Sequence, residues 1–290
     1  MAILNVRHTT SYRYQRPVHF GDHRLMLRPR DSHDLRLIQT SLTCSPPATL
    51  TWHYDVFGNS IAIASFAEPA AELRIESALR LEIYGVNRPA FQISPEAVSY
   101  PFIYSADDRI DLGRMLERQH PDPDDRLSSW ARGFVRSNPT DTSALLADLN
   151  SGVGAWILYQ SRETEGTQTP VETLNRGCGS CRDLAVLLIE AARTLGFGAR
   201  VVTGYLYNPE ADGHANAAVG AGTTHAWAEI YVPGSGWIAY DPTNGTISGA
   251  DLIRVAVTRD IGQAVPISGS FVGVLDDYRG MTVDVSVCSE

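Results

Sequence analysis

The chain has 290 residues and a formal net charge of −9, and all 24 of its lysine and arginine positions are arginine. The absence of lysine excludes mechanisms that need a lysine amine, such as Schiff-base catalysis or phosphate binding by a P-loop. The negative charge argues against a general nucleic-acid binder, which would carry a basic face. The length suggests about two domains, with a core large enough to fold without disulfide bonds.

Neither a membrane span nor a secretion signal is evident. No stretch approaches the roughly 18 consecutive apolar residues that a membrane span needs. Arg7, His8 and Arg13 stand where a signal peptide would have its apolar core, so a cytoplasmic location is expected. The cysteines are too few and too unevenly spaced for the disulfide framework of a secreted protein. We expect no membrane or nucleic-acid partner, no cofactor and no metal.

Residues 1–90 are predicted to form an antiparallel β domain. Short alternating or β-branched runs are separated by Pro, Gly and Asp; they lie at residues 3–6, 8–14, 25–27, 35–42 and 73–84. Phe57-Gly58-Asn59 predicts a hairpin turn, because Gly and Asn tolerate positive φ. Ten arginines against eight acids give this part a net charge of +2 in a chain of −9, which supports a boundary near residue 90.

Residues 91–142 are predicted to be a linker with short helices. Prolines interrupt this segment, and Asp125 or the pair Ser128 and Ser129 is expected to cap a helix that continues through Val135. Apolar residues then recur with helical spacing from Ser143 to Gln160. We expect a second domain over residues 143–290, with a β tail at its C-terminal end.

The segment after residue 170 has the strongest periodic pattern. Apolar residues recur every three or four positions after Cys181, which predicts an amphipathic helix that ends at Gly196. A strand is predicted for residues 199–207 and a mobile loop rich in Gly, Ala and Asn for residues 208–222. Residues 223–232 and 237–241 are predicted to be two strands joined by the turn at 233–236.

Cys181 is expected at the first turn of this helix, directly after a glycine-rich approach. A helix N-terminus presents unpaired N–H groups and a partial positive charge. That position stabilises a thiolate and lowers the pKa of a thiol from its reference of about 8.5. The same N–H groups could hold an oxyanion, so one local geometry would activate a nucleophile and stabilise a transition state.

A partner base for this thiol is expected on the next strands. Period two places His225 opposite the apolar face formed by Ala226, Ala228 and Ile230, so His225 belongs to the functional face. If the two strands pair through their short turn, Asp241 lies near His225 and orients its imidazole. This is the logic of a thiolate, a general acid and base, and an acceptor that fixes the tautomer.

Three segments together resemble the core of the transglutaminase-like superfamily. They are Gly179-Ser180-Cys181-Arg182-Asp183-Leu184-Ala185, His225-Ala226-Trp227 and Asp241-Pro242-Thr243. Their spacing is similar to that of a bacterial branch often described as cysteine proteases, and the N-terminal segment resembles the β domain that precedes the core in that branch. The latter likeness rests on Tyr12-x-Tyr14-x-x-Pro17-Val18, Leu27-Arg28-Pro29-Arg30 and Asp55-x-Phe57-Gly58-Asn59.

The resemblance implies an α+β, papain-like core, in which the helix that carries the nucleophile packs on an antiparallel sheet. It implies that Cys181, His225 and Asp241 form a catalytic triad for acyl transfer from an amide donor through a thioester. We expect hydrolysis of a peptide or protein substrate, with transamidation as a further possibility, because water needs no acceptor site. An aromatic residue upstream of the cysteine often helps to bind the oxyanion in this family, which makes Tyr159 and then Trp156 candidates.

Neighbouring polar and aromatic residues receive lesser roles. Ser180 and Trp227 are candidates for the oxyanion or substrate pocket, and Trp227 is expected to pack over it. Asp183 is expected to interact with the helix dipole and not to take part in catalysis. The N-terminal histidines show no ligand spacing and are expected on the surface or in turns; they are His8, His19, His23, His33 and His53.

Three alternatives remain open. Cys178 and Cys181 resemble a dithiol redox motif, but that interpretation gives His225 and Asp241 no role. The pair could bind zinc with His214 or His225, although a CxxC motif without a second pair is a weak signal. The fold could also serve as a non-catalytic binding module. Cys178 further leaves open an oxidative shut-off through a disulfide with Cys181.

Overall fold

The computed structural model describes residues 2–84, 92–162, 166–207, 224–249 and 251–290. The strands are β1 (Ala2–Phe20), β2 (His23–Arg28), β3 (Leu35–Ser45), β4 (Ala48–Tyr54), β5 (Ser60–Phe66), β6 (Ala70–Ile83), β7 (Ser99–Tyr100), β8 (Thr140–Asp141), β9 (Leu158–Tyr159), β10 (Cys178–Gly179), β11 (Ala199–Leu206), β12 (Thr224–Val232), β13 (Gly236–Asp241), β14 (Thr246–Ile247), β15 (Leu252–Thr258), β16 (Ile267–Ser268), β17 (Phe271–Val272) and β18 (Tyr278–Ser289). The α-helices are α1 (Ala106–Leu112), α2 (Arg126–Arg132), α3 (Thr142–Trp156), α4 (Pro170–Arg176) and α5 (Cys181–Thr194). The predicted loop at 208–222 lies outside the described residues.

The N-terminal region consists of two antiparallel sheets packed face to face. One sheet has the order β17-β1-β6-β3, with β18 also paired to β1, and the other has the order β16-β2-β5-β4. Leu25, Ala62 and Ile75 are among the buried side chains between them. The predicted hairpin turn joins β4 to β5, and Gly58 has φ +76° there, a value that L side chains rarely adopt. The predicted antiparallel β region is confirmed.

The first strand is longer than the two separate runs predicted at residues 3–6 and 8–14. It pairs continuously with β6 from Ala2 to Arg13, and its buried residues alternate with more exposed ones over most of this length. Alternation places His8 on the buried face, where its side chain is 2% exposed. His23 is also buried. The expectation that these two histidines lie on the surface or in turns is therefore wrong.

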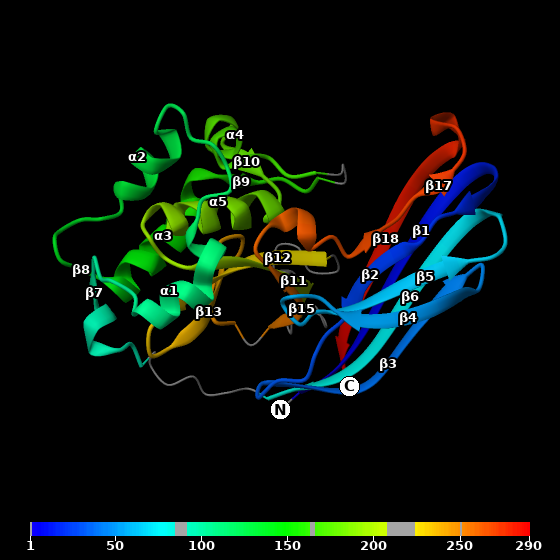
Figure 1. Ribbon diagram of the computed structural model, residues 1–290, viewed down its shortest axis with the longest axis horizontal. Helices are drawn as coiled ribbons and strands as arrows, with labels where there is room; N and C mark the ends of the chain where they lie inside the picture. Colours follow the sequence, from blue (N-terminus) through cyan, green and yellow to red (C-terminus); the bar gives the residue numbers. More distant parts are fainter. Residues whose placement is uncertain (1, 85–91, 163–165, 208–223, 250) are drawn as a thin grey trace.

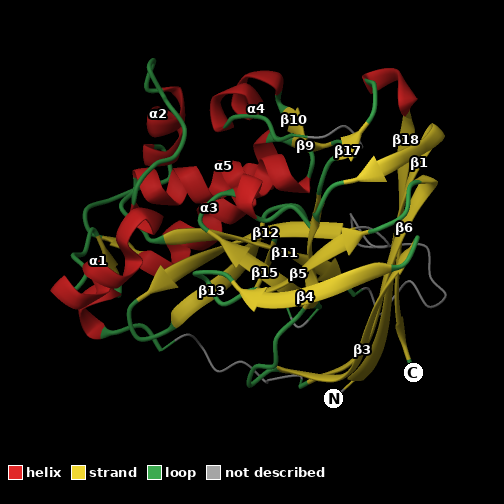
Figure 2. Ribbon diagram, turned by 45° about the vertical axis from the view of Figure 1, so that its right-hand side comes forward, coloured by secondary structure: helices red, strands yellow, loops and turns green. Residues whose placement is uncertain are grey.

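The second part of the chain packs helices on one face of an antiparallel sheet of order β14-β13-β12-β11-β15 (Figure 2). Apolar residues from α2 to α5 pack against the face of that sheet that carries Ala228, Ile230 and Val232. The period-two prediction for this strand is thus confirmed. Together with the N-terminal sheets, this arrangement confirms the predicted α+β fold class.

Helix ends in this part follow local hydrogen-bonding rules with one difference from expectation. Helix α3 begins after Asp141, whose carboxylate accepts a hydrogen bond from the Ala144 N–H at 2.7 Å. Asp125 precedes α2, but its backbone is left-handed and its side chain makes no cap hydrogen bond. Asp122 takes that role, because its carboxylate accepts from the N–H groups of Leu127 and Ser128.

The two parts share a buried junction. Leu4, Val6 and Leu81 of the N-terminal sheet pack with Tyr205 of β11 and Ile253 of β15. Figure 1 shows the N-terminal strands beside the core sheet, with the two chain ends close together. The last strand, β18, returns from the core to pair with β1, so the C-terminal segment completes the N-terminal sheet.

The segment before α3 is tied to α5 by a buried ion pair. Arg193 donates to Glu190 at 2.7 Å, and both side chains are 1% exposed. Glu190 also accepts from the backbone N–H groups of Gln119 and His120, and Arg193 donates to the carbonyl of Met115. These bonds hold the 115–120 segment against the helix that begins at Cys181. No described helix has the length and apolar character needed to cross a membrane.

Candidate active site

Cys181 is the first residue of α5, and its side chain is half-buried. The turn before it is fixed by Asp183, whose carboxylate accepts from the backbone N–H and the hydroxyl of Ser180, both at 2.8 Å. Gly179 is required there, because a Cβ at that position would lie 2.8 Å from the Cβ of Asp183. Gly179 and the Asp183 carboxylate therefore fix the turn that leads into Cys181.

Asp183 also holds the segment that passes in front of this helix end. Its second carboxylate oxygen accepts from the Gln168 N–H at 2.7 Å and from the Arg162 guanidinium at 2.8 Å. The Asp183 side chain is fully buried, and a buried carboxylate needs such partners. This role as a positioning acid goes beyond the expected dipole interaction, and the sequence pattern alone did not reveal Arg162 or Gln168.

His225 and Asp241 lie together on neighbouring strands. Glu229 pairs with Ala239 and Ala228 with Tyr240 in the β12–β13 ladder, which places the end of β13 beside the start of β12. His225 Nε2 and Asp241 Oδ2 are 2.8 Å apart, and both side chains are fully buried. The predicted pairing of these strands and the proximity of the two side chains are confirmed.

Asp241 is held by the residues that follow it. Its Oδ1 accepts from the Thr243 N–H at 2.9 Å, and its Oδ2 accepts from the side-chain amide of Asn244 at 2.8 Å. The bond from residue i+2 is an Asx turn, for which the Asp-Pro-Thr-Asn sequence is a recognisable signal. Asn244 was missed, although an amide three residues after a candidate acid could have been singled out.

The electrostatics of the pair favour a charged histidine. Burial alone would lower the pKa of His225, but its hydrogen bond with Asp241 and its interactions with Cys181 raise it to about 10. Burial would raise the pKa of Asp241, but the bonds from His225, Asn244 and the Thr243 backbone hold it below its usual range. Both shifts favour an imidazolium beside a carboxylate.

Because Nε2 of His225 bonds to Asp241, Nδ1 is the ring nitrogen that remains to interact with the Cys181 thiol. Nδ1 is buried and has no well-aligned hydrogen-bond partner among the described residues. Cys181 nevertheless lies close enough to shift the pKa of the ring.

Trp227 packs against His225. Its ring stacks on His225 with a centroid distance of 6.1 Å and an interplanar angle of 29°. Gly204 of β11 pairs with His225, and a Cβ on Gly204 would lie 1.9 Å from the Ile253 carbonyl oxygen and 3.1 Å from the Trp227 ring. A glycine is therefore needed for the strands and the indole to approach this closely.

The other predicted pocket residues differ in how they are placed relative to Cys181. Tyr159 pairs with Gly179 across β9 and β10, two residues before Cys181, and its pKa is raised by burial and by Cys181. Ser180 uses its hydroxyl to bind Asp183. Trp156 is 56% exposed and contacts Trp130 edge to face, with a centroid distance of 6.4 Å; no described contact brings it to Cys181.

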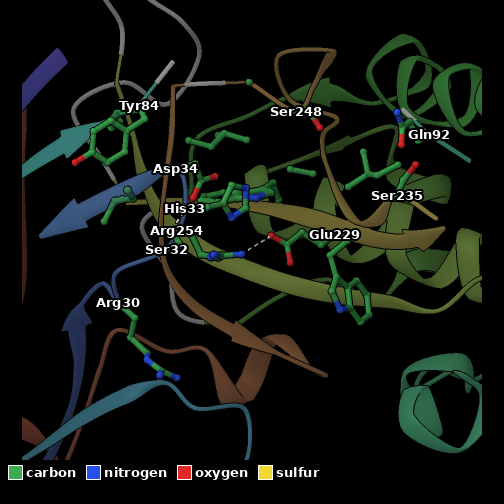
Figure 3. A pocket seen from close by; sticks show the side chains of 18 of the residues that line it. Arg30, Ser32, His33, Asp34, Tyr84, Gln92, Glu229, Ser235, Ser248 and Arg254 are labelled. Atoms are coloured by element: carbon green, nitrogen blue, oxygen red, sulfur yellow. Dashed lines mark hydrogen bonds and ion pairs between the residues drawn. The ribbon is translucent and has the colours of Figure 1, made fainter. Parts of the chain in front are cut away.

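A cavity of about 440 Å³, lined in part by Trp227, lies between the core sheet and the N-terminal region. We call it the polar cavity; Trp227, Glu229, Arg254, Asp34 and His33 are among its lining residues. Figure 3 shows Arg254 reaching Glu229, with His33 and Asp34 beside it. Glu229 is 2.6 Å from Arg200 and 3.4 Å from Arg254, so its charge is compensated inside the protein.

Within the described ranges, no three His, Cys, Asp or Glu side chains gather into a group that could hold a metal ion. His214, one of the two predicted zinc partners, lies outside those ranges. Cys178 and Cys181 are both free thiols. The arrangement of a helix-terminal thiol, a buried imidazole and a carboxylate can support nucleophilic acyl transfer.

Two family descriptions match separate parts of the chain. The bacterial transglutaminase-like N-terminal region matches residues 4–82, and the transglutaminase-like superfamily matches residues 128–242, a range that contains Cys181, His225 and Asp241. The core belongs to the transglutaminase-like superfamily. Members of this superfamily are typically cysteine-dependent enzymes. The N-terminal match covers β1 to β6 apart from the ends, which agrees with the antiparallel sheets described above.

Comparisons over the full length agree with this assignment. An uncharacterized protein of Mycobacterium leprae (strain TN) is 26% identical over 291 residues, covering 98% of this chain and 97% of the relative. A crystal structure from Cytophaga hutchinsonii, named a "putative cysteine protease", superposes with a TM-score of 0.73 at 18% identity, covering 100% of this chain and 91% of that chain. That similarity shows that the two proteins share the fold of both parts.

Proposed function

We propose that this protein is a cysteine-dependent acyl-transfer enzyme that cleaves amide bonds through a thioester, with water as the usual acceptor. Cys181 is the nucleophile, His225 the general acid and base, and Asp241 the residue that orients and charges the imidazole. The observation that carries this proposal is the fully buried His225–Asp241 bond of 2.8 Å, with the thiol at the helix N-terminus beside the ring.

The chemistry follows from these positions. The Cys181 thiolate attacks the carbonyl carbon of an amide, and the electron pair of the carbonyl moves to oxygen to form an oxyanion. In this proposal the N-terminal N–H groups of α5 stabilise that charge, with the Tyr159 hydroxyl as a further donor. His225 donates its proton to the departing amine, and a thioester on Cys181 results.

Water completes the cycle. Neutral His225 removes a proton from water as the water oxygen attacks the thioester carbonyl. The tetrahedral intermediate collapses to a carboxylic acid and releases the Cys181 thiolate, and His225 is again protonated. Transamidation would use the same thioester with an amine in place of water, and no described residue supplies a dedicated amine site.

The decisive experiment uses acyl capture. We expect p-nitrophenyl acetate to acylate Cys181 in preference to the three other cysteines, as located by mass spectrometry of the quenched protein. Cys181→Ala should abolish this labelling, whereas Cys178→Ala should retain it. Iodoacetamide at mildly acidic pH should show the same preference, because a thiolate reacts under conditions in which ordinary thiols do not. Equal labelling of all four cysteines would contradict the nucleophile assignment.

The same material separates the alternatives. Cys178→Ala removes the CxxC pair and should leave acylation of Cys181 intact, whereas a dithiol redox function would be lost with either cysteine. Addition of a primary amine during the ester reaction tests the second acceptor. Faster release of Cys181 with formation of an amide would show transamidation, and an unchanged rate would leave hydrolysis as the reaction.

A further inference from the structure

A second cavity of about 560 Å³ lies where the N-terminal sheet meets the core, and we call it the junction groove. It is lined by residues from both parts of the chain. One end is formed by Arg182 and Thr224. Arg182 follows Cys181 directly in the chain, and Thr224 directly precedes His225, so both lie within one residue of the proposed catalytic pair. The groove lining therefore includes the direct chain neighbours of both proposed catalytic residues.

The far wall of the groove is built by the N-terminal region. Tyr12 pairs with Met281 and Thr10 with Val283 in the β1–β18 ladder, and all four side chains line the groove. Directly opposed residues of antiparallel strands share a face of the sheet. Met281 is 36% and Val283 46% exposed, so this wall presents apolar surface that the described residues leave partly uncovered.

The remaining lining extends this apolar character. Phe271 and Ile267 belong to the segment that leads from the core back to β18, and they line the same groove. Binding sites are mostly apolar with a few placed polar groups, and this groove has that composition. Exposed apolar surface grouped in a concave site is more informative than single exposed side chains.

Among the described residues that line the groove there is no Asp or Glu, although the whole chain is strongly acidic. His8 also lines the groove, and burial lowers its pKa to about 4, so it is neutral at neutral pH. Burial likewise lowers the pKa of His23. Arg182 is then the charged member of the described lining, at the catalytic end.

We propose that the junction groove binds an apolar or aromatic side chain of the acyl-donor peptide, and that the N-terminal β region thereby sets substrate specificity. The inference rests on the proposed function, because it is the position of the groove beside Cys181 that makes its occupant the acyl donor. A cationic side chain is disfavoured, since the described wall is apolar and offers no carboxylate among the described residues to compensate its charge.

The test compares cysteine-reactive dipeptides, each N-acetylated and carrying a C-terminal acyloxymethyl ketone. The set is Ala-Ala, Phe-Ala, Ala-Phe, Arg-Ala and Ala-Arg, and the readout is the second-order rate constant for modification of Cys181. We expect one of the Phe peptides to react about ten-fold or more faster than Ala-Ala, because burial of an aromatic side chain supplies that discrimination. The corresponding Arg peptide should react no faster than Ala-Ala.

Matched variants on one strand locate the effect. Met281→Asp places a charge on the groove wall, whereas Thr282→Asp places the same charge on the next residue, which is exposed and does not line the groove. Met281→Asp should lose most of the Phe advantage and Thr282→Asp should keep it. Met281→Ala provides a milder change in the same direction. Denaturant unfolding of each variant tests whether that variant is folded.

Iodoacetamide separates the two proposals, because this small reagent needs an activated thiolate but no groove. Preferential alkylation of Cys181 in all variants, together with a Phe advantage lost only at Met281, supports both. Preferential alkylation without any Phe preference, or with a preference equal in Met281→Asp and Thr282→Asp, overturns the groove assignment alone. If iodoacetamide shows no preference for Cys181, the proposed function fails, and the substrate assignment fails with it.

Discussion

The polar cavity and the junction groove both lie between the N-terminal sheets and the core, but they differ in their charged and apolar groups. In the polar cavity, Glu229 is enclosed by Arg200 and Arg254, so the charges are satisfied within the chain. In the junction groove, Met281 and Val283 are partly exposed and no described carboxylate faces them. A cavity whose buried carboxylate is paired with arginines contributes to stability, whereas one with partly exposed apolar surface is suited to a ligand.

The largest effect is expected at the candidate active site, on the rate of hydrolysis. Asp241→Asn removes the charge that orients His225, and loss of such an acid lowers turnover by roughly 10³- to 10⁴-fold. Hydrolysis of the p-nitrophenyl ester of N-acetyl-Ala-Phe would measure it. Asp284→Asn, an equal change on exposed β18, should leave the rate unaltered. A fall of less than ten-fold in folded Asp241→Asn protein would show that Asp241 does not support the imidazole.

The polar cavity should respond in stability instead of activity. Glu229→Gln leaves two buried or half-buried arginines without their carboxylate, and breaking a buried ion pair in this way costs about 3 kcal/mol. Urea unfolding would measure the loss. The control is Glu117→Gln, which breaks the exposed pair with Arg114 and should cost no more than about 0.5 kcal/mol. Equal losses in the two variants would remove the structural role that separates this cavity from the groove.

A pH effect of intermediate size is expected at the junction itself. His8 bonds to the Tyr205 hydroxyl and the Thr10 hydroxyl, each at 3.0 Å, and burial lowers its pKa from 6.5 to about 4. The unfolded chain therefore binds a proton more readily, so this contribution to stability is complete above pH 6.5 and is lost as the pH falls toward 4.

The check is the difference in urea midpoint between pH 7 and pH 5. It should be larger in the wild type than in His8→Asn, which has no group to titrate at that position. His19→Asn changes an exposed histidine of the same strand and should keep the wild-type difference. If His8→Asn also keeps it, another group titrates at the junction.

The smallest stability change is expected on the groove wall. Met281→Asp should lower the free energy of unfolding by less than about 1 kcal/mol, because the side chain is partly exposed on an edge strand. Thermal and urea unfolding would measure it beside Glu229→Gln. A loss as large as that of Glu229→Gln would mean that the groove wall is part of the core and not a free binding surface.

Local patterns predicted much of the fold and the central pair of the site. The alternation along residues 224–232 placed His225 on the face away from Ala228 and Ile230, and the short turn after Val232 brought Asp241 back beside it. The Gly58 turn was equally local. In each case the residues that decide the structure lie within one hairpin, so the sequence contains the information at short range.

The remaining features depend on contacts between distant segments. His8 was expected on the surface or in a turn, because Tyr205, which bonds to it, belongs to the distant core segment. The pairing of β18 with β1 joins residues more than two hundred positions apart, and both strands carry ordinary alternation that names no partner. Asp122 caps α2 in place of Asp125 because the intervening turn brings the earlier carboxylate to the helix end.

The late position of β18 also imposes an order on the synthesis of the protein. A nascent chain that has emerged as far as β15 already contains Cys181, His225 and Asp241, but it lacks the strand that carries Met281 and Val283. One wall of the junction groove is therefore absent until residues 278–289 have left the ribosome. The ribosome therefore synthesises the proposed nucleophile before it synthesises the groove wall that is proposed to select the substrate.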